Sequence, residues 1–131
     1  MSKLLGVDYG TEQVGIAISD DDKKQAFVYA TIPAESVLEE LEDIIEKEGV
    51  ETIVLGLPLS LSGAIGPQAE KVQEFGYSLE DALPVRVEYE DERFTTKVSA
   101  DLASAMGPDV DDHQLAAQEI LQTYIDRTSN V

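Results

Sequence analysis

The sequence predicts an α/β domain in which a mixed sheet carries helices on its faces. The first observation is the order of the hydrophobic patterns: three strands, a helix, a strand, a helix, a strand and two helices. The second is residues 52–57, a nearly continuous apolar run bounded by Pro58, which is typical of a strand covered on both faces. The third is length, because 131 residues suffice for one core and are too few for two lobes.

Three apolar segments at the N-terminus, residues 4–7, 14–19 and 26–32, are joined by short polar turns and predict a β-meander. Asp8 ends the first of these strands, and Gly10 follows in the turn. An acidic residue at this hairpin tip can supply a metal ligand or a phosphate contact. It can equally be a turn residue that accepts hydrogen bonds from nearby backbone amides.

The first helix is predicted by a capping box of Ser36 and Glu39 and by an apolar stripe that ends near Gly49. The apolar run at residues 52–57 follows it and should lie centrally in the sheet. Alternating apolar residues at 85–89 then predict the fifth strand.

Three more helices are expected. Pro67 suits the first position of the second helix, whose apolar face continues to Phe75. Thr95 or Thr96 can cap the third helix, and the last helix begins near Asp112. Helix crossovers make the later strands parallel, so ligands are expected near the carboxyl ends of those strands.

The loop at residues 58–66 is rich in Ser, Leu and Gly, and two interpretations of it remain open. It can be an ordinary connection between a strand and a helix. Alternatively, its backbone amides and the positive end of the next helix approach a phosphate, with help from Ser60, Ser62 and Lys71.

The charge is strongly acidic: nine Lys and Arg against 27 Asp and Glu give a net charge of −18. Such a chain repels nucleic acid at low salt, so a nucleic-acid enzyme of this charge needs divalent cations, high salt or a local basic patch. Many of the acidic residues crowd segments 39–51 and 80–92, which favours a solubility adaptation for most of the acidic residues.

The composition also excludes several classes of protein. The chain has no cysteine, so disulfides and thiolate metal sites are impossible. No apolar run approaches the length of a membrane span, and the N-terminus lacks the features of a signal peptide. We therefore expect a soluble cytoplasmic protein that does not bind membranes.

Acidic residues end two of the predicted strands, Asp8 on the first and Asp91 with Glu92 on the fifth. If these strands are neighbours, their carboxylates converge. Converging carboxylates raise one another's pKa, and a hard divalent ion such as Mg²⁺ relieves the repulsion.

Five segments, in this order along the chain, resemble the YqgF/RuvX family: residues 6–11, 54–59, 66–69, 91–96 and 115–121. Members of this family are assigned to pre-16S rRNA processing or to Holliday junction resolution. The resemblance covers nearly the whole chain and implies one domain over residues 1–131. It implies a ribonuclease-H-like α/β fold with a mixed five-stranded sheet and helices on both faces. It further implies a metal-dependent nuclease with two Mg²⁺ or Mn²⁺ ions and a nucleic-acid substrate.

The resemblance also implies a set of metal ligands: Asp8, one of Asp91 and Glu92, and a third residue at the start of the last helix. Strand alternation puts Asp91 and Glu92 on opposite faces, and its longer side chain favours Glu92. His113 stands where the family usually has its last aspartate, and histidine suits Mn²⁺ better than Mg²⁺. Asp112 can replace it as a ligand, although Asp112 is equally well explained as a helix cap.

Candidate substrate contacts lie beside these segments: Arg93, Thr95 and Lys97, together with Ser60, Ser62 and Lys71. Arg93 either contacts a phosphate or pairs with Asp91. Residues 107–112 are short and acidic where relatives carry a basic loop. Three explanations remain open: the substrate is held at another part of the protein, salt and metal ions compensate for the missing basic loop, or nuclease activity has been lost.

The preferred hypothesis is thus a nuclease in pre-16S rRNA processing, with Holliday junctions as the alternative substrate. A junction resolvase needs two active sites and hence a homodimer, whereas RNA cleavage is open to a monomer. A non-catalytic binding or scaffold protein of the same fold is a further alternative. Residues 8–11 also resemble the phosphate loop of sugar kinases and actin-like ATPases, but those enzymes close two lobes around the nucleotide.

Overall fold

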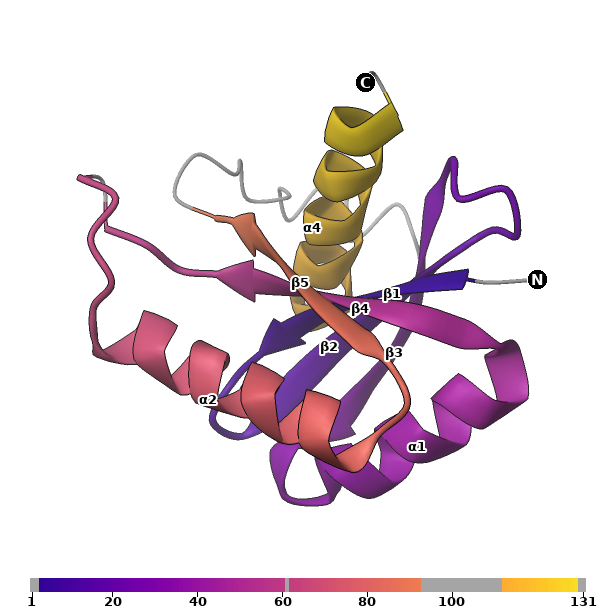
Figure 1. Cartoon of the computed structure of the whole chain (residues 1–131), viewed down its shortest axis with the longest axis horizontal. Coiled ribbons are helices and arrows are strands. Elements are labelled where there is room, and N and C mark those ends of the chain that lie inside the picture. Colours follow the sequence, from indigo (N-terminus) through magenta and orange to yellow (C-terminus); the bar gives the residue numbers. More distant parts are fainter. Residues whose placement is uncertain (1–2, 61, 93–111, 130–131) are drawn as a thin grey trace.

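A computed structural model describes residues 3–60, 62–92 and 112–129. Five strands form one sheet flanked by helices (Figure 1). The strands are β1 (Lys3–Tyr9), β2 (Gln13–Ser19), β3 (Ala26–Pro33), β4 (Val50–Leu57) and β5 (Arg86–Asp91). The helices are a short 3₁₀ helix η1 (Ala34–Ser36), α1 (Val37–Glu48), α2 (Pro67–Ala82) and α4 (Asp112–Ser129). The helix predicted from Thr95 or Thr96 onward lies outside the described residues.

The strands are ordered β3-β2-β1-β4-β5. The first three are antiparallel, which confirms the meander, and β4 and β5 run parallel to β1, which confirms a mixed sheet. The condition that the first and fifth strands are neighbours is not met, because β4 lies between them. The central place of β4 is the one predicted for the apolar run at residues 52–57, whose side chains are nearly all buried.

Helices cover both faces of the sheet, as predicted. One core lies between the sheet and helices α1 and α2 and includes Leu5 and Val7 of β1. A second core lies under α4, drawn in yellow in Figure 1, and includes Leu4. Because side chains alternate along a strand, Asp8 points to the α4 face and Tyr9 to the other.

Two glycines let α4 lie very close to the sheet. A Cβ atom on Gly6 would lie 2.7 Å from the carbonyl oxygen of Ala117, and one on Gly15 would lie 1.9 Å from that of His113. Since Gly15 is the β2 partner of Asp8, this packing brings the first turn of α4 beside Asp8.

The predicted capping box at the start of α1 is wrong. Ser36 makes no side-chain cap, and its hydroxyl instead donates to the carboxylate of Glu40 at 3.0 Å. The preceding 3₁₀ turn explains this, because it gives Ser36 a ψ of 17° instead of the extended backbone of an N-cap. The other end is as predicted: Gly49 has a φ of 73° and donates to the carbonyl of Ile45.

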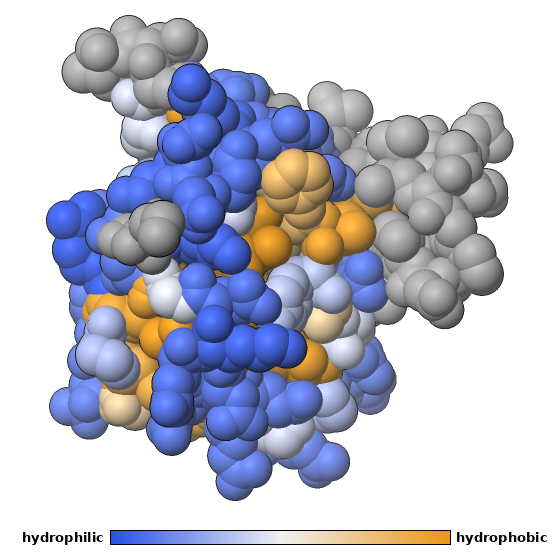
Figure 2. Space-filling view, turned by 90° about the vertical axis from the view of Figure 1, so that its right-hand side faces the viewer, coloured by the Kyte–Doolittle hydropathy of each residue, from blue (hydrophilic) through white to orange (hydrophobic). Residues whose placement is uncertain are grey.

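The highly charged composition predicts a largely hydrophilic surface. On the face seen in Figure 2, hydrophilic residues predominate and hydrophobic ones appear mainly as narrow strips between them. Within the described ranges, no helix combines the length and the apolar character that crossing a bilayer requires.

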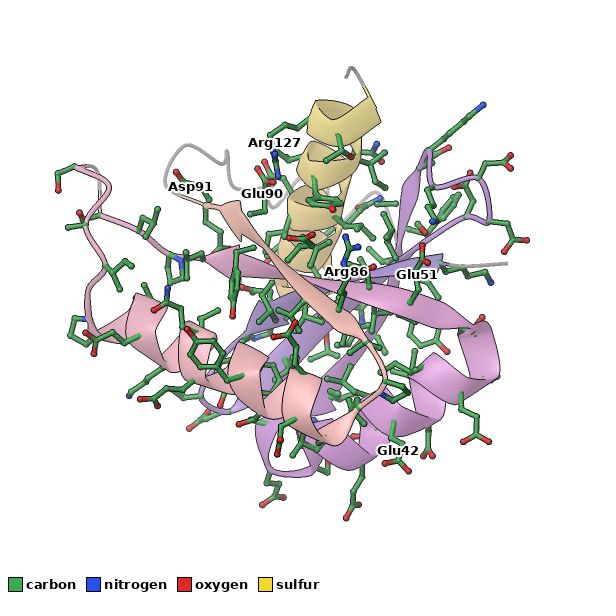
Figure 3. All side chains as sticks on the ribbon, in the orientation of Figure 1. Glu42, Glu51, Arg86, Glu90, Asp91 and Arg127 are labelled. Carbon is green, nitrogen blue, oxygen red and sulfur yellow. The ribbon has the colours of Figure 1, made fainter. Side chains whose placement is uncertain are left out.

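An ion pair holds the far end of α4 to β5. Arg127 donates from Nε and Nη2 to Oε1 of Glu90 at 3.0 and 2.8 Å, and the Glu90 side chain is only 8% exposed (Figure 3). The Arg127 guanidinium also lies 5.4 Å from the centre of the Tyr124 ring. The pair therefore ties the last turns of α4 to the strand that leads to Glu92.

Replacing Arg127 with Met is expected to lower the free energy of unfolding by about 2 kcal/mol, because it leaves the buried Glu90 carboxylate without its cation. The cost falls below that of a fully buried pair, since the Arg127 side chain is 57% exposed. Arg86→Met is the matched control, because its ion pair with Glu88 is exposed and is worth less than about 1 kcal/mol. Urea unfolding of both variants measures the difference, and equal losses would contradict this assignment.

Candidate functional site

A cavity of about 480 Å³ opens where β1 ends. The carboxyl ends of parallel strands are where ligands gather in sheets of this kind. The turn between β1 and β2, the first half of α2 and the start of α4 surround it. Its lining residues are Asp8, Tyr9, Gly10, Thr11, Glu12, Gln13, Pro58, Gln68, Lys71, Val72, Glu92 and His113.

Asp8 reaches the cavity from the α4 face of β1. Its β2 partner is Gly15, so no side chain from that strand covers it. Burial raises the pKa of Asp8, and the nearby His113 lowers it. The carboxylate is thus partly desolvated, and a positive charge in the cavity would stabilise it.

Glu92, the residue that follows β5, also lines the cavity. Its N–H donates to the carbonyl of Leu57 at 3.0 Å, so the chain is still anchored to β4 at this point. Burial, together with the negative charges of Asp8, Asp91 and Glu119, raises the pKa of Glu92 to about 7. Glu92 and Asp8 are therefore close enough to repel one another.

This pair of carboxylates fits a hard divalent cation. Across the described ranges, no three His, Asp or Glu side chains lie close enough together to share an ion. Mg²⁺ is nevertheless commonly held by one or two carboxylates, with water and substrate phosphate oxygens as its other ligands. The donor set of Asp8 and Glu92 has that character.

Two cationic or potentially cationic side chains line the same cavity. His113 comes from the first turn of α4, and Lys71 comes from the second turn of α2. Lys71 is the one Lys or Arg among the described lining residues. It gives a strongly acidic protein a positive charge at the cavity.

Comparisons with known proteins identify the family of this chain. A model of the RuvX family, described as Holliday junction resolvase, matches residues 2–127. The chain belongs to the RuvX family. Two relatives carry the name "Putative pre-16S rRNA nuclease". The one from Caldanaerobacter subterraneus is 38% identical over 138 residues, covering 98% of this chain and 99% of the relative. The one from Clostridium botulinum is 40% identical over 136 residues, covering 97% and 98%.

Solved structures extend the likeness to the fold. RuvC of T. thermophilus, in a complex with a Holliday junction substrate, matches with a TM-score of 0.62 at 12% identity, covering 98% of this chain and 96% of that one. The Holliday junction resolvase of fowlpox virus matches with a TM-score of 0.57 at 10% identity, covering 95% and 99%. The ribonuclease-H-like fold is thereby confirmed for this RuvX protein.

Several predicted site residues of the RuvX protein lie away from the cavity lining. Asp91 pairs in register with Leu57 at the end of β5, and the exposed Asp112 begins α4. The Ser60 and Ser62 hydroxyls lie 2.9 Å apart, and Ser60 also accepts from the Ala64 N–H at 3.1 Å. These two serines therefore stabilise their own loop.

Three further candidates, Arg93, Thr95 and Lys97, lie outside the described residues, as does most of the acidic segment 107–112. The sequence did not mark residues 11–13 or Gln68 as site residues, although they line the cavity. Thr11 and Gln68 belong to segments 6–11 and 66–69, which carry the family resemblance and could have pointed to them, whereas Glu12 and Gln13 carry no distinctive pattern. Tyr9 was also missed as a lining residue, and it stacks on Phe75 with ring centres 4.1 Å apart.

Proposed function

We propose that this RuvX protein is a metal-dependent nuclease that hydrolyses phosphodiester bonds in the precursor of 16S rRNA. The observation that carries the proposal is the pair of carboxylates, Asp8 and Glu92, which meet in one cavity beside Lys71. The names of the two relatives support the choice of RNA. The proposal includes a cytoplasmic location, which is the one expected from the sequence.

Two Mg²⁺ or Mn²⁺ ions would be held by Asp8 and Glu92, with His113 or Asp112 contributing to the second. Such ions activate water for attack on a phosphodiester and stabilise the leaving oxygen. The residues of the chain would position these ions and bind the substrate. Asp8 and Glu92 fix the position of the ions, and Lys71 binds a substrate phosphate.

The electrostatics of the cavity support this division of roles. Burial disfavours two adjacent carboxylates, so divalent cations gain affinity by neutralising them. Once Asp8 and Glu92 are neutralised, Lys71 attracts phosphate with Glu12 as the one remaining acidic side chain among the described lining residues. The net charge of −18 still repels nucleic acid at longer range, so salt is expected to aid association.

Cleavage of a labelled pre-16S leader RNA by the purified protein tests the proposal. Asp8→Asn is expected to reduce the rate with Mg²⁺ or Mn²⁺ by at least about 100-fold, because even groups that only orient metal ligands change affinity by 10- to 100-fold. Asp43→Asn, the same change at an exposed site on α1, is the control and should cleave like wild type. If no salt concentration or metal gives cleavage that depends on Asp8, the nuclease assignment fails and the non-catalytic alternative replaces it.

The second candidate substrate is the Holliday junction, which the description of the family model favours. A four-way DNA junction in the same assay distinguishes the two. Symmetrical cutting of the junction requires two active sites, so sedimentation should then find a homodimer. Cleavage of the leader RNA by a monomer would support the rRNA assignment.

A further inference from the structure

The two carboxylates of the proposed metal site, Asp8 and Glu92, come from strands that do not touch. Asp8 belongs to β1, Glu92 follows β5, and β4 lies between these strands. Val7 pairs with Leu55 of β4, and Asp8 and Gly56 are the next residues on the two strands. Gly56 itself pairs with Glu90 of β5. Any direct approach of Glu92 to Asp8 therefore passes over Gly56.

The side chain of Glu92 lies directly against the backbone of Gly56. A Cβ atom on Gly56 would stand 2.6 Å from the Glu92 Cδ and 2.7 Å from its Oε1. It would also stand 2.4 Å from the Cδ1 of Ile120, whereas real Cβ atoms essentially never come closer than 3.0 Å. The φ of Gly56 is not positive, so glycine is needed here for space and not for backbone conformation.

We infer that Gly56 is a positioning residue for the carboxylate pair: its missing side chain leaves the path across β4 along which Glu92 reaches Asp8. The inference rests on the proposed function, and it adds a residue that acts only through Glu92. A methyl group at this position would displace the Glu92 carboxyl or push α4 outward through Ile120. Displacement of the Glu92 carboxyl would separate it from Asp8, whereas an outward movement of α4 would by itself leave both carboxylates in place, because neither belongs to that helix.

The chain offers a matched control for this effect. A Cβ on Gly6 would also clash with α4, at 2.7 Å from both the carbonyl oxygen of Ala117 and the Cβ of Leu121. None of its three nearest atoms belongs to Glu92. Gly6→Ala should therefore weaken the packing of α4 while leaving Glu92 in place.

The clash with Ile120 can also be removed. Ile120→Val deletes the Cδ1 atom, so of the three nearest contacts the Gly56→Ala/Ile120→Val double variant keeps the two with Glu92. Its reference is Ile120→Val alone. The double variant is thus expected to fold and to carry the effect on the carboxylate pair.

Mn²⁺ binding to the full-length protein, measured by electron paramagnetic resonance, gives the first readout. Gly56→Ala/Ile120→Val should bind Mn²⁺ at least about tenfold more weakly than Ile120→Val, which is the usual effect of disturbing the support of a metal ligand. Gly6→Ala should lower the melting temperature and should weaken Mn²⁺ binding less than Gly56→Ala/Ile120→Val does, because it leaves Glu92 untouched and acts only through α4. Equal Mn²⁺ affinities for Gly56→Ala/Ile120→Val and Ile120→Val would overturn the inference.

A metal-free double-mutant cycle gives the second readout. In EDTA at pH 8, the unfolding free energies of Asp8→Asn, Glu92→Gln and the pair measure the repulsion between the carboxylates. This coupling should fall by more than half in the Gly56→Ala/Ile120→Val background, and full retention would overturn the inference. If the wild-type protein binds no Mn²⁺, the proposed metal site fails, and this cycle alone decides the role of Gly56.

Discussion

Glu92→Gln is expected to abolish metal-dependent cleavage and, without divalent ions at pH 8, to raise the melting temperature. The reason is the burial of Glu92 beside Asp8, which raises the pKa of Glu92 to about 7 from 4.5. A raised pKa means that folding favours the protonated acid. Its stabilising contribution is complete below pH 4.5 and is lost as the pH rises through about 7. At pH 8 the ionised Glu92 therefore strains the fold, and a neutral glutamine relieves the strain.

The expected gain from Glu92→Gln is about 1 kcal/mol, or roughly 3 °C, after allowance for the solvent that screens a half-buried group. It should vanish near pH 4, where Glu92 is protonated in both the folded and the unfolded protein. Calorimetry at both pH values measures it. Glu42→Gln, on the exposed side of α1, is the control with the same charge change and should show neither effect (Figure 3).

Added Mg²⁺ should reverse the order of stability at pH 8. It should raise the melting temperature of the wild type, whose carboxylates it neutralises, more than that of Glu92→Gln. A variant that is less stable than the wild type at both pH values without metal would contradict the repulsion between Asp8 and Glu92.

Gly15→Ala is expected to cost about 3 kcal/mol of unfolding free energy, the upper part of the usual range for overpacking. Its Cβ would lie 1.9 Å from the carbonyl oxygen and 2.3 Å from the carbonyl carbon of His113. These are backbone atoms at the start of α4, so no side-chain rotation removes the clash and the helix must move. The movement also withdraws His113 from Asp8, so cleavage should fall with stability.

Gly66→Ala is the matched control for Gly15→Ala, because a Cβ on Gly66 meets no atom within 4 Å. Gly66 is the N-cap of α2 and has an extended backbone, so alanine should cost less than about 1 kcal/mol there. Urea unfolding compares the two variants. Equal losses would mean that α4 does not lie as close to β2 as the structure has it.

The strands could be predicted from the sequence because each carries its own hydrophobic pattern, which does not depend on the segments beside it. The apolar residues at 52–57 are typical of a strand buried on both faces, and β4 is such a strand. Pro67 marked the start of α2 for a similarly local reason, since its fixed φ suits the first helical turn. The capping box at Ser36 failed because the preceding 3₁₀ turn set the backbone of Ser36.

The candidate site, too, could be predicted only in part from the sequence. Asp8 stood out because an acidic residue ended an apolar strand, and Glu92 was preferred to Asp91 by strand alternation and side-chain length. The structure puts both Asp8 and Glu92 in one cavity and leaves Asp91 out of its lining. Their roles as metal ligands remain a proposal.

The sequence by itself determined the class of the fold, the order of the described elements and the strand ends that carry acidic residues. These properties depend on hydrophobic periodicity and on turn and cap residues, which act over a few neighbouring positions. Only the tertiary structure decided that β4 separates the two acidic strands and that Glu92 crosses it over Gly56. That contact joins residues far apart in the chain, and it depends on the absence of a side chain, which no local pattern distinguishes from an ordinary glycine in a strand.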